Sequence, residues 1–268
     1  MRRAMPGPAD REALLGDMPD AGPWVGLACR LGLKRTIRAW GCRFVVHDPF
    51  LSMANAWYIR NGRHERPEAT LSLRHLDPSL PVVEVGGGLG VVACVVNATL
   101  ADRGRHVVVE MDPRAAAVLR RNRDLNHSGF EVVEAAIAYD AGINLSNERG
   151  TFHGGTRLAK DGTGPSPGHG TLRQLVEGRG WTRFNLVMDI EGMELEILRN
   201  EPDLLRDRVA VLVLELHPGL GAPTQEAANA VRRLEALGLH LVDWMGSSMA
   251  FVNDRLVAVS PPAMAVRT

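Results

Sequence analysis

Hydrophobic residues are distributed differently before and after residue 80. From residue 80 onward, short runs rich in Val, Leu and Ile alternate with segments whose apolar residues recur every three or four positions. Runs of the first kind predict buried strands, and segments of the second kind predict helices. This alternation is typical of a mostly parallel sheet with helices on both faces. We therefore predict an α/β fold for residues 80–268.

The predicted strands are Val82–Val85, His106–Glu110, Phe130–Ala136, Phe184–Asp189, Val209–Leu216, His240–Trp244 and Met249–Asn253. The predicted helices are Val91–Asp102, Pro113–Asn126, Leu172–Arg179, Met193–Asn200 and Thr224–Leu237. Residues 245–248 alone separate the last two strands, which is too short for a parallel crossover. We therefore predict a seven-stranded, mostly parallel sheet that ends in an antiparallel hairpin.

Two stretches lack this alternation. Residues 1–79 are punctuated by Pro, Gly and Trp, which indicates a helical or irregular N-terminal cap on the substrate side of a main domain at residues 80–268. The glycine-rich stretch Asp140–Gly170 would leave the carboxyl edge of the third strand, where open α/β sheets bind ligands. It contains His153 and His169, which either cover an acceptor or are ordinary polar loop residues.

The first chemical signal is the strand Val82–Val85, which contains Glu84 and is followed by Gly86, Gly87, Gly88, Leu89 and Gly90. Glycines allow unusual φ values and close approach of a ligand to the backbone. The next predicted strand ends at Glu110, whose carboxylate can accept hydrogen bonds from both ribose hydroxyls of a nucleoside. Residues 88–93 also fit the looser G-x-G-x-x-A nicotinamide fingerprint, so the loop alone leaves both cofactors open.

Two further strands end in polar residues. Asp189 ends the fourth strand and precedes Glu191, Glu194 and Glu196, so it is either a site residue or the cap of the next helix. The fifth strand carries Glu215 and His217, which strand periodicity places on one side. A histidine there can accept a proton from a hydroxyl near neutral pH. We take His217 as the candidate base, with Asp189 and Glu215 as alternatives or orienting partners.

With these segments in order, residues 60–220 resemble the FkbM family of S-adenosylmethionine-dependent methyltransferases. The residues that carry the resemblance are Asn61–Glu65, Glu84–Gly90, Glu110–Pro113, Leu119, Asn122, Leu125, Asn126, Glu134–Ile137, Thr171–Leu172, Asp189–Glu194 and Glu215–His217. The Asp-x-Glu-Gly-x-Glu element at 189–194 is the most family-specific of them. The chain departs from the family pattern in two places: Gly87 and Gly88 replace Ala-Asn, and Met188 replaces a lysine.

The resemblance implies a Rossmann-like class I methyltransferase that binds S-adenosylmethionine and releases S-adenosylhomocysteine. It implies a cofactor-binding set in which the glycines meet the methionine part, Glu110 the ribose, and Ala136 and Ile137 the adenine. Glu65 and Asp189 would lie near the amino-acid moiety or the reacting centre. The complete predicted set is Glu65, Glu84, Gly86, Gly88, Gly90, Glu110, Met111, Ala136, Ile137 and Asp189. Family members methylate hydroxyls of sugars or secondary metabolites, which makes O-methylation of a small-molecule or carbohydrate acceptor the expected reaction.

Composition limits the classes of partner that we expect the protein to bind. The 268 residues carry 31 Lys+Arg and 31 Asp+Glu, which gives no electrostatic reason to bind nucleic acid. The first 20 residues contain no signal-peptide-like apolar stretch, and the apolar stretch Pro81–Ala101 is interrupted by Glu84 and four glycines, so we expect a cytoplasmic protein without a membrane partner. Cys29, Cys42 and Cys94 have no metal-ligand or disulfide-framework spacing, which fits a reducing compartment.

Two alternative functions remain at this stage. An NAD(P)-dependent oxidoreductase predicts NADH binding and a parallel final strand. A non-catalytic or metal-binding module would use Asp189, Glu191, Glu215 and His217 as an oxygen-rich site. A divalent metal is compatible with the residues, but we assign no metal ligands. The N-terminal segment with Trp24, Trp40 and Trp57 either packs over the site or contacts a second subunit, which leaves a homodimer open.

Overall fold

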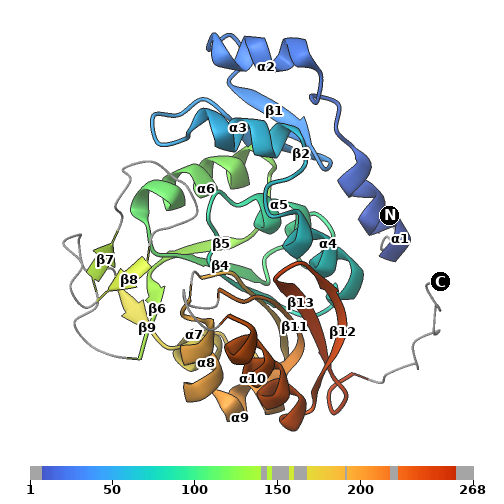
Figure 1. Ribbon diagram of the computed structural model, residues 1–268, viewed down its shortest axis with the longest axis vertical. Helices are drawn as coiled ribbons and strands as arrows, with labels where there is room; N and C mark the ends of the chain where they lie inside the picture. Colours follow the sequence, from blue (N-terminus) through green and yellow to red (C-terminus); the bar gives the residue numbers. More distant parts are fainter. Residues whose placement is uncertain are drawn as a thin grey trace.

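A seven-stranded sheet forms the centre of the protein (Figure 1). The computed structural model describes residues 8–139, 144–146, 157–159, 168–190, 192–217 and 223–257. In spatial order the strands are β12 (Leu239–Met245), β13 (Ser248–Asn253), β11 (Val209–Glu215), β10 (Phe184–Met188), β3 (Val82–Val85), β4 (His106–Glu110) and β5 (Glu131–Glu134). Adjacent pairs from β11 to β5 are parallel, whereas β13 is antiparallel to both β11 and β12.

The strand order confirms the predicted fold class. After β3 the chain adds β4 and β5 on one side, then returns through β10 to the other side, so β3 and β10 flank a topological switch point. The final hairpin folds back so that β13 is inserted between β11 and β12, which places the reversed strand one position inside the edge. This is the Rossmann-like order of class I methyltransferases. The parallel final strand that the oxidoreductase alternative predicts does not form.

One predicted strand is wrong. Instead of a single strand Phe130–Ala136, the chain forms β5 and then the short β6 (Ala136–Ile137), which leaves the main sheet and pairs with β9 (His169–Gly170). The break occurs at Ala135, whose N–H bonds back to the carbonyl of Val133. The sequence shows no Gly or Pro at this bend, so its apolar run gave no sign of it.

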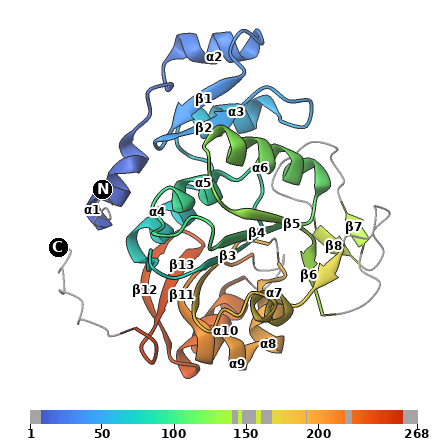
Figure 2. The same ribbon diagram turned by 180° about the vertical axis from the view of Figure 1, so that it is seen from behind.

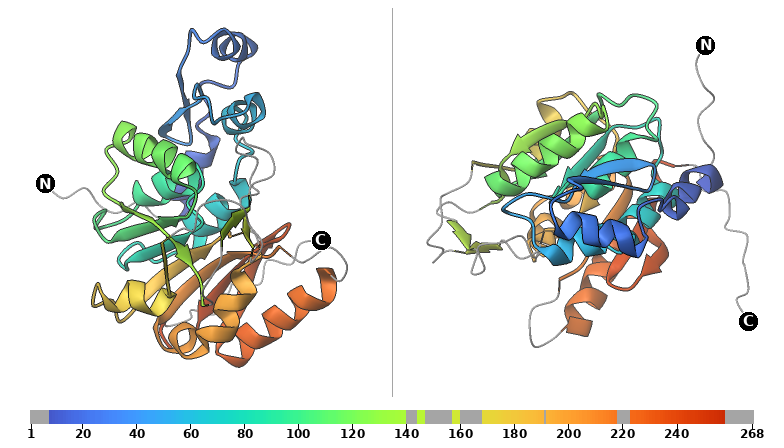
Figure 3. Two further views of the ribbon diagram at one scale, coloured as in Figure 1. Left: turned by 90° about the vertical axis from the view of Figure 1, so that its left-hand side faces the viewer. Right: turned by 90° about the horizontal axis from the view of Figure 1, so that it is seen from above.

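Helices cover both faces of the sheet (Figures 1 and 3). On one side lie α4 (Arg66–His75), α5 (Val91–Asn97) and α6 (Pro113–Leu125). On the other lie α7 (Leu172–Glu177), α8 (Glu194–Asn200), α9 (Pro202–Arg208) and α10 (Pro223–Ala236). Alternate strand residues serve the two layers, because Val82 and Val108 pack in one hydrophobic cluster while Val83 and Val107 pack in the other. No helix among these residues is long and apolar enough to cross a membrane.

Two helices differ from the prediction. The helix predicted over Val91–Asp102 ends at Asn97, whose buried amide donates to the carbonyl of Arg103 and accepts from the N–H of Gly129. These contacts turn the chain toward β4, so the helix stops early. The sequence did not predict α9, because this short helix buries only Leu204 and Leu205 among charged residues and therefore lacks a clear period.

The N-terminal residues form more structure than the sequence indicates. They comprise α1 (Pro8–Ala13), a 3-10 helix η1 (Leu14–Gly16), α2 (Pro23–Arg30), the antiparallel hairpin β1 (Thr36–Ala39) and β2 (Cys42–Val45), and α3 (Met53–Arg60). Figure 2 shows α2 and this hairpin at one end of the molecule, beyond α6 and α5. Ile37, Trp40 and Phe44 belong to the same hydrophobic cluster as α4 and α5. The division at residue 79 remains a prediction, with α4 packed within the helix layer of the sheet.

Candidate cofactor and acceptor site

The glycine turn after β3 has a backbone that side chains would not fit. Gly86, Gly88 and Gly90 have φ values of 92°, 49° and 78°, in the region that favours glycine. A Cβ atom on Gly86 would lie 1.7 Å from the carbonyl oxygen of Asp189, and one on Gly90 would lie 2.3 Å from Leu119. The N–H groups of Gly86 and Gly87 both donate to the carbonyl of Val109 at 3.0 Å. The turn is therefore held between the ends of β4 and β10.

Glu110, at the end of β4, is bound to this turn. Its Oε2 accepts the N–H of Gly88 at 2.7 Å, and its Oε1 accepts the N–H of Asp112 at 2.8 Å. An ionised carboxylate has about four acceptor positions, so each oxygen retains one for a ligand. Burial raises the pKa of Glu110 to about 7, although the two N–H donors act in the opposite direction. The carboxylate is thus fixed in position, with two acceptor positions left.

Carboxylates gather around the glycine turn and the ends of β10 and β11. We call this set the carboxylate cluster; its members are Glu65, Glu68, Glu84, Glu110, Asp189 and Glu215. Glu65 precedes α4 with a left-handed φ of 49°, and its charge raises the pKa values of Glu68, Glu84, Glu110 and Asp189. Within the described part of the chain, no Lys or Arg forms an ion pair with any member. The cluster therefore gathers acids without a paired Lys or Arg, and a cationic group bound among them would favour their ionised forms.

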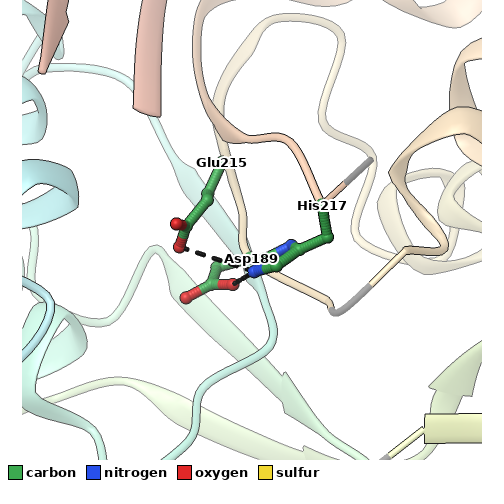
Figure 4. Close-up of side chains that lie close together, drawn as sticks. All are labelled: Asp189, Glu215 and His217. Carbon is green, nitrogen blue, oxygen red and sulfur yellow. Dashed lines mark ion pairs between the residues drawn. The ribbon is translucent and has the colours of Figure 1, made fainter. Parts of the chain in front are cut away.

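Asp189, Glu215 and His217 meet at the carboxyl ends of β10 and β11 (Figure 4). Nε2 of His217 lies 3.6 Å from Oδ1 of Asp189 and 3.7 Å from Oε2 of Glu215. Burial raises the pKa of Asp189 to about 9, and the charges of Glu65, Glu215 and Glu68 act in the same direction. The structure thus brings together the three residues that we predicted to be catalytic. We call them the Asp-Glu-His triad.

Glu194, which the sequence left as a helix-end carboxylate, orients His217. Its side chain is 1% exposed, and its oxygens accept the N–H groups of Ile190 at 3.1 Å and Gly192 at 2.9 Å. Nδ1 of His217 lies 2.9 Å from Oε1 of Glu194. A carboxylate that already accepts backbone N–H bonds accepts a further proton donor, so Nδ1 carries the hydrogen. Nε2 consequently faces Asp189 and Glu215.

The turn between β12 and β13 supplies two hydroxyl groups that the sequence did not point to. The Ser247 hydroxyl donates to Oε1 of Glu215 at 2.6 Å, and the Ser248 hydroxyl bonds to Oε1 of Glu68. Burial raises the pKa of Glu68 to about 7; the Ser248 bond lowers it, while the charges of Glu215 and Glu65 raise it. Glu68 lies on α4 three residues after Glu65, just under one helical turn, but a single acid on a helix gave no sequence signal.

Glu84 lies deeper than a direct ligand contact would suggest. Its side chain is 3% exposed, and its Oε2 is 3.5 Å from Nε2 of His106 on the next strand. Burial raises the pKa of Glu84 well above its usual value, with further contributions from Glu65 and Asp189, and burial lowers the pKa of His106 to about 3. Glu84 is therefore buried between β3 and β4, and its place in the cofactor-binding set remains a prediction.

The remaining predicted residues lie around this site or outside the described residues. Ala136 and Ile137 are buried on β6, beside β4, and His169 is exposed on β9. Met111 is partly buried directly after Glu110. His153 and Glu191 lie outside the described residues. Of the long glycine-rich stretch, the structure describes β7 (Asn144–Ser146), β8 (Arg157–Ala159) and residues 168–170, with β7 and β8 antiparallel.

Comparisons with known proteins find similarity to solved methyltransferase structures. No family model and no curated protein matches the chain. Aeropyrum pernix fibrillarin, solved with natively bound S-adenosyl-L-methionine, is 14% identical over 69% of this chain and 73% of that chain, with a TM-score of 0.41. M. jannaschii TYW2, in complex with AdoMet, is 12% identical over 81% and 82%, with a TM-score of 0.39. Precorrin-6y C5,15-methyltransferase from Geobacter metallireducens GS-15 is 17% identical over 69% and 85%, with a TM-score of 0.38. At these values the fold assignment rests on this chain's own strand order.

Proposed function

We propose that the protein is an S-adenosylmethionine-dependent methyltransferase that methylates a hydroxyl group of a sugar or secondary metabolite. The observation that carries the proposal is the carboxylate cluster around the glycine turn. S-adenosylmethionine brings a positive sulfonium and an ammonium group, which would favour the ionised forms of these acids and be stabilised by them. A nicotinamide dinucleotide would bring its anionic pyrophosphate to the same turn, where the carboxylates would repel it. Charge thus favours the first cofactor over the second.

Three features of the chain fit the parts of this cofactor. The two open acceptor positions of Glu110 match the two ribose hydroxyls. The buried side chains of Ala136 and Ile137 offer an apolar contact for adenine beside β4. Glu65, whose charge reaches four other members of the cluster, is suited to the ammonium group. When bound, the cofactor supplies an activated methyl group for in-line displacement.

The Asp-Glu-His triad is the part of the site that would receive the acceptor. Because methyl transfer from a sulfonium needs little further activation of the donor, the chain's main contribution is to position the acceptor and remove its proton. Glu194 holds the Nδ1 hydrogen of His217, so Nε2 can accept a proton from a hydroxyl group. Glu215 lies close enough to stabilise the imidazolium that forms, and the imidazolium in turn favours the ionised form of Asp189.

Membership of the FkbM family is part of the proposal, and one departure from that family has a physical explanation here. A Cβ atom on Gly87 would lie 2.4 Å from Cγ1 of Val108 and 3.0 Å from Leu119. The space that an alanine methyl would need is thus filled by β4 and α6. Gly87 leaves room for the side chains of Val108 and Leu119, so this departure does not argue against a cofactor at the turn.

Methyl transfer from methyl-labelled S-adenosylmethionine to a panel of sugar and polyhydroxylated acceptors tests the proposal. With a productive acceptor, His217→Asn is expected to lower kcat by about 10²–10⁴-fold, the usual contribution of general base catalysis. Its affinity for S-adenosylhomocysteine should stay unchanged. His240→Asn is the matched control, because His240 pairs with Asp254 on the exposed far edge of the sheet. Full turnover by His217→Asn would contradict the assigned role of this histidine.

A further inference from the structure

The Asp-Glu-His triad has the geometry of a three-ligand metal site. One oxygen each of Asp189 and Glu215 and Nε2 of His217 all lie within 4.8 Å of one another. Ligand atoms that share one ion at about 2.1 Å are about 3.0–3.6 Å apart for bond angles between 90° and 120°. The two separations from Nε2, 3.6 and 3.7 Å, are close to the upper end of this range. They also exceed the length of an ordinary hydrogen bond.

The support behind His217 is the kind that metal-binding histidines have. A ligating histidine almost always donates its other ring N–H to a carboxylate or carbonyl, which fixes the tautomer and orients the ring. Glu194 does this here at 2.9 Å from Nδ1, and two backbone N–H groups hold Glu194 in turn. Glu215 is likewise held by the Ser247 hydroxyl through Oε1, while its Oε2 faces His217. Two of the three ligands are thus pre-oriented toward one point, the space between them in Figure 4.

We infer that Asp189, Glu215 and His217 bind a divalent cation of the Mn²⁺ or Mg²⁺ type, on which the oxygen atoms of the acceptor complete the coordination. Two carboxylates balance the charge of such an ion, and oxygen ligands with one imidazole suit Mn²⁺ in particular. Three protein ligands in a six-coordinate site leave three positions. Two neighbouring hydroxyls of a carbohydrate could occupy two of them. The inference rests on the proposed function for this choice of acceptor, but the binding of the ion does not.

The ion would change how the acceptor hydroxyl is activated. A hydroxyl oxygen bound to a divalent cation loses its proton more readily, because the ion stabilises the alkoxide. His217 would then act as a ligand rather than as the proton acceptor, and the hydroxyl proton would pass to solvent water. The predicted loss of turnover in His217→Asn is the same in both cases, so binding of the ion itself must be measured.

Titration of the metal-free protein with Mn²⁺, followed by the electron paramagnetic resonance signal of the free ion, tests the inference. We expect one site per chain, at least tenfold weaker in Glu215→Gln and in Asp189→Asn. Glu194→Gln should weaken binding about tenfold by its effect on His217, within the range for outer-shell residues. His240→Asn should leave it unchanged. Thermal unfolding of each variant shows that it is folded. Mn²⁺ binding that is absent, or equally strong in both ligand variants, would overturn the inference.

Binding of S-adenosylhomocysteine in the presence of a chelator separates the two proposals. If the nucleoside binds in the chelator and Mn²⁺ does not bind, the metal site is wrong and the methyltransferase proposal stands. If Mn²⁺ binds at the triad and S-adenosylhomocysteine does not bind, the metal site stands and the proposed function is wrong. Where both bind, loss of methyl transfer on chelation and its recovery with Mn²⁺ or Mg²⁺ support the ion's catalytic role. Undiminished transfer in the chelator contradicts that role.

Discussion

At the scale of single residues, Glu110 shows how the site opposes the stability of the fold. Its side chain is buried, and its pKa of about 7 lies well above the usual value of 4.5. The folded protein therefore holds a proton that the unfolded chain has released between these two pH values. Stability that depends on this group falls as the pH rises from about 4.5 to about 7. A ligand that hydrogen-bonds to the anion would reverse part of this loss.

The pH dependence of the apo protein's melting temperature checks this sign. Glu110→Gln removes the titrating group while keeping an acceptor for one of the two N–H groups of Gly88 and Asp112. We expect the melting temperature of the wild type to fall more steeply between pH 5 and pH 8 than that of the variant. Because the other buried acids are present in both proteins, the difference reports mainly the titration of Glu110. Parallel curves would show that Glu110 has an ordinary pKa.

Gly86 supports a second prediction at this scale. Its φ of 92° is unfavourable for a residue with a side chain, and a Cβ atom at this position would lie 1.7 Å from the carbonyl oxygen of Asp189. Gly180, at the end of α7, has a φ of 65° with nothing within 4 Å, so it reports the cost of the backbone conformation alone. That cost is about 1–2 kcal/mol. The loss in free energy of unfolding should be larger for Gly86→Ala than for Gly180→Ala by about 1–3 kcal/mol, the usual cost of overpacking.

Urea denaturation of both glycine variants measures the difference. A larger loss for Gly86→Ala, together with weaker binding of S-adenosylhomocysteine, is the expected result. Equal losses would mean that the turn and the end of β10 can separate without cost, and that the close contact to Asp189 does not hold the site together.

Sequence could predict the site residues whose signal is local. Glycines directly after an apolar strand, and Glu110 at the end of the next strand, are recognisable by spacing. Glu194 was visible as a residue but not in its role, because only the fold brings it to His217, 23 positions later. Ser248 and Glu68 are 180 positions apart. No local pattern relates them, so their contact could not be predicted.

At the scale of elements, α6 and β2 are joined by two asparagines. Asn122 accepts the N–H of Val45 at 2.8 Å and donates to the carbonyl of Leu89 in the glycine turn at 2.8 Å. Asn126, one helical turn later, bonds to both the N–H and the carbonyl of Arg43 at 2.7 Å. Four helix residues and two strand residues span about the same 6 Å, so the two elements match in length. The hairpin is thereby fixed relative to the cofactor loop.

Asn122→Ala should destabilise the protein by about 2–4 kcal/mol, because it leaves a buried N–H and a buried carbonyl without their partner. Asn126→Ala removes two bonds to Arg43 and one to the carbonyl of Asn122, but Arg43 is exposed and water can replace the bonds to it, so a smaller loss is expected. Chemical denaturation of the two variants gives the comparison. If Asn122→Ala destabilises the protein no more than Asn126→Ala, the Asn122 hydrogen bonds do not couple the hairpin to the glycine turn.

Elements with a strong hydrophobic period were predictable, and those defined by tertiary contacts were not. The buried strands β3 and β4 match their predicted bounds, since continuous Val-rich runs end at polar or glycine residues. The hairpin β1–β2 was missed because each strand has only four residues; Arg38 and Arg43 follow the alternation of a half-buried strand, but over too few positions to stand out. Hydrogen bonds with Asn122 and Asn126 fix the position of the hairpin against α6, and hydrophobic periodicity cannot reveal such contacts.

At the scale of the whole molecule, the sheet collects the site from distant parts of the chain. The glycine turn, Glu110, Asp189 and Glu215 all follow strands whose carboxyl ends meet at one edge, around the switch point between β3 and β10. The N-terminal helix α4 and the final hairpin add Glu65, Glu68 and two serines. A cation seated among these carboxylates should stabilise the folded state, and a ligand at about 100 times its dissociation constant adds about 2.7 kcal/mol.

Calorimetric titration of S-adenosylhomocysteine and of NADH into the wild type and Glu110→Gln tests the central claim most directly. We predict that S-adenosylhomocysteine binds once per chain and that Glu110→Gln binds it about 10–100-fold more weakly, the loss of hydrogen bonds to a charged group. NADH should not bind to either protein. Binding of NADH without binding of S-adenosylhomocysteine would contradict the account, because the carboxylate cluster would then accommodate an anion.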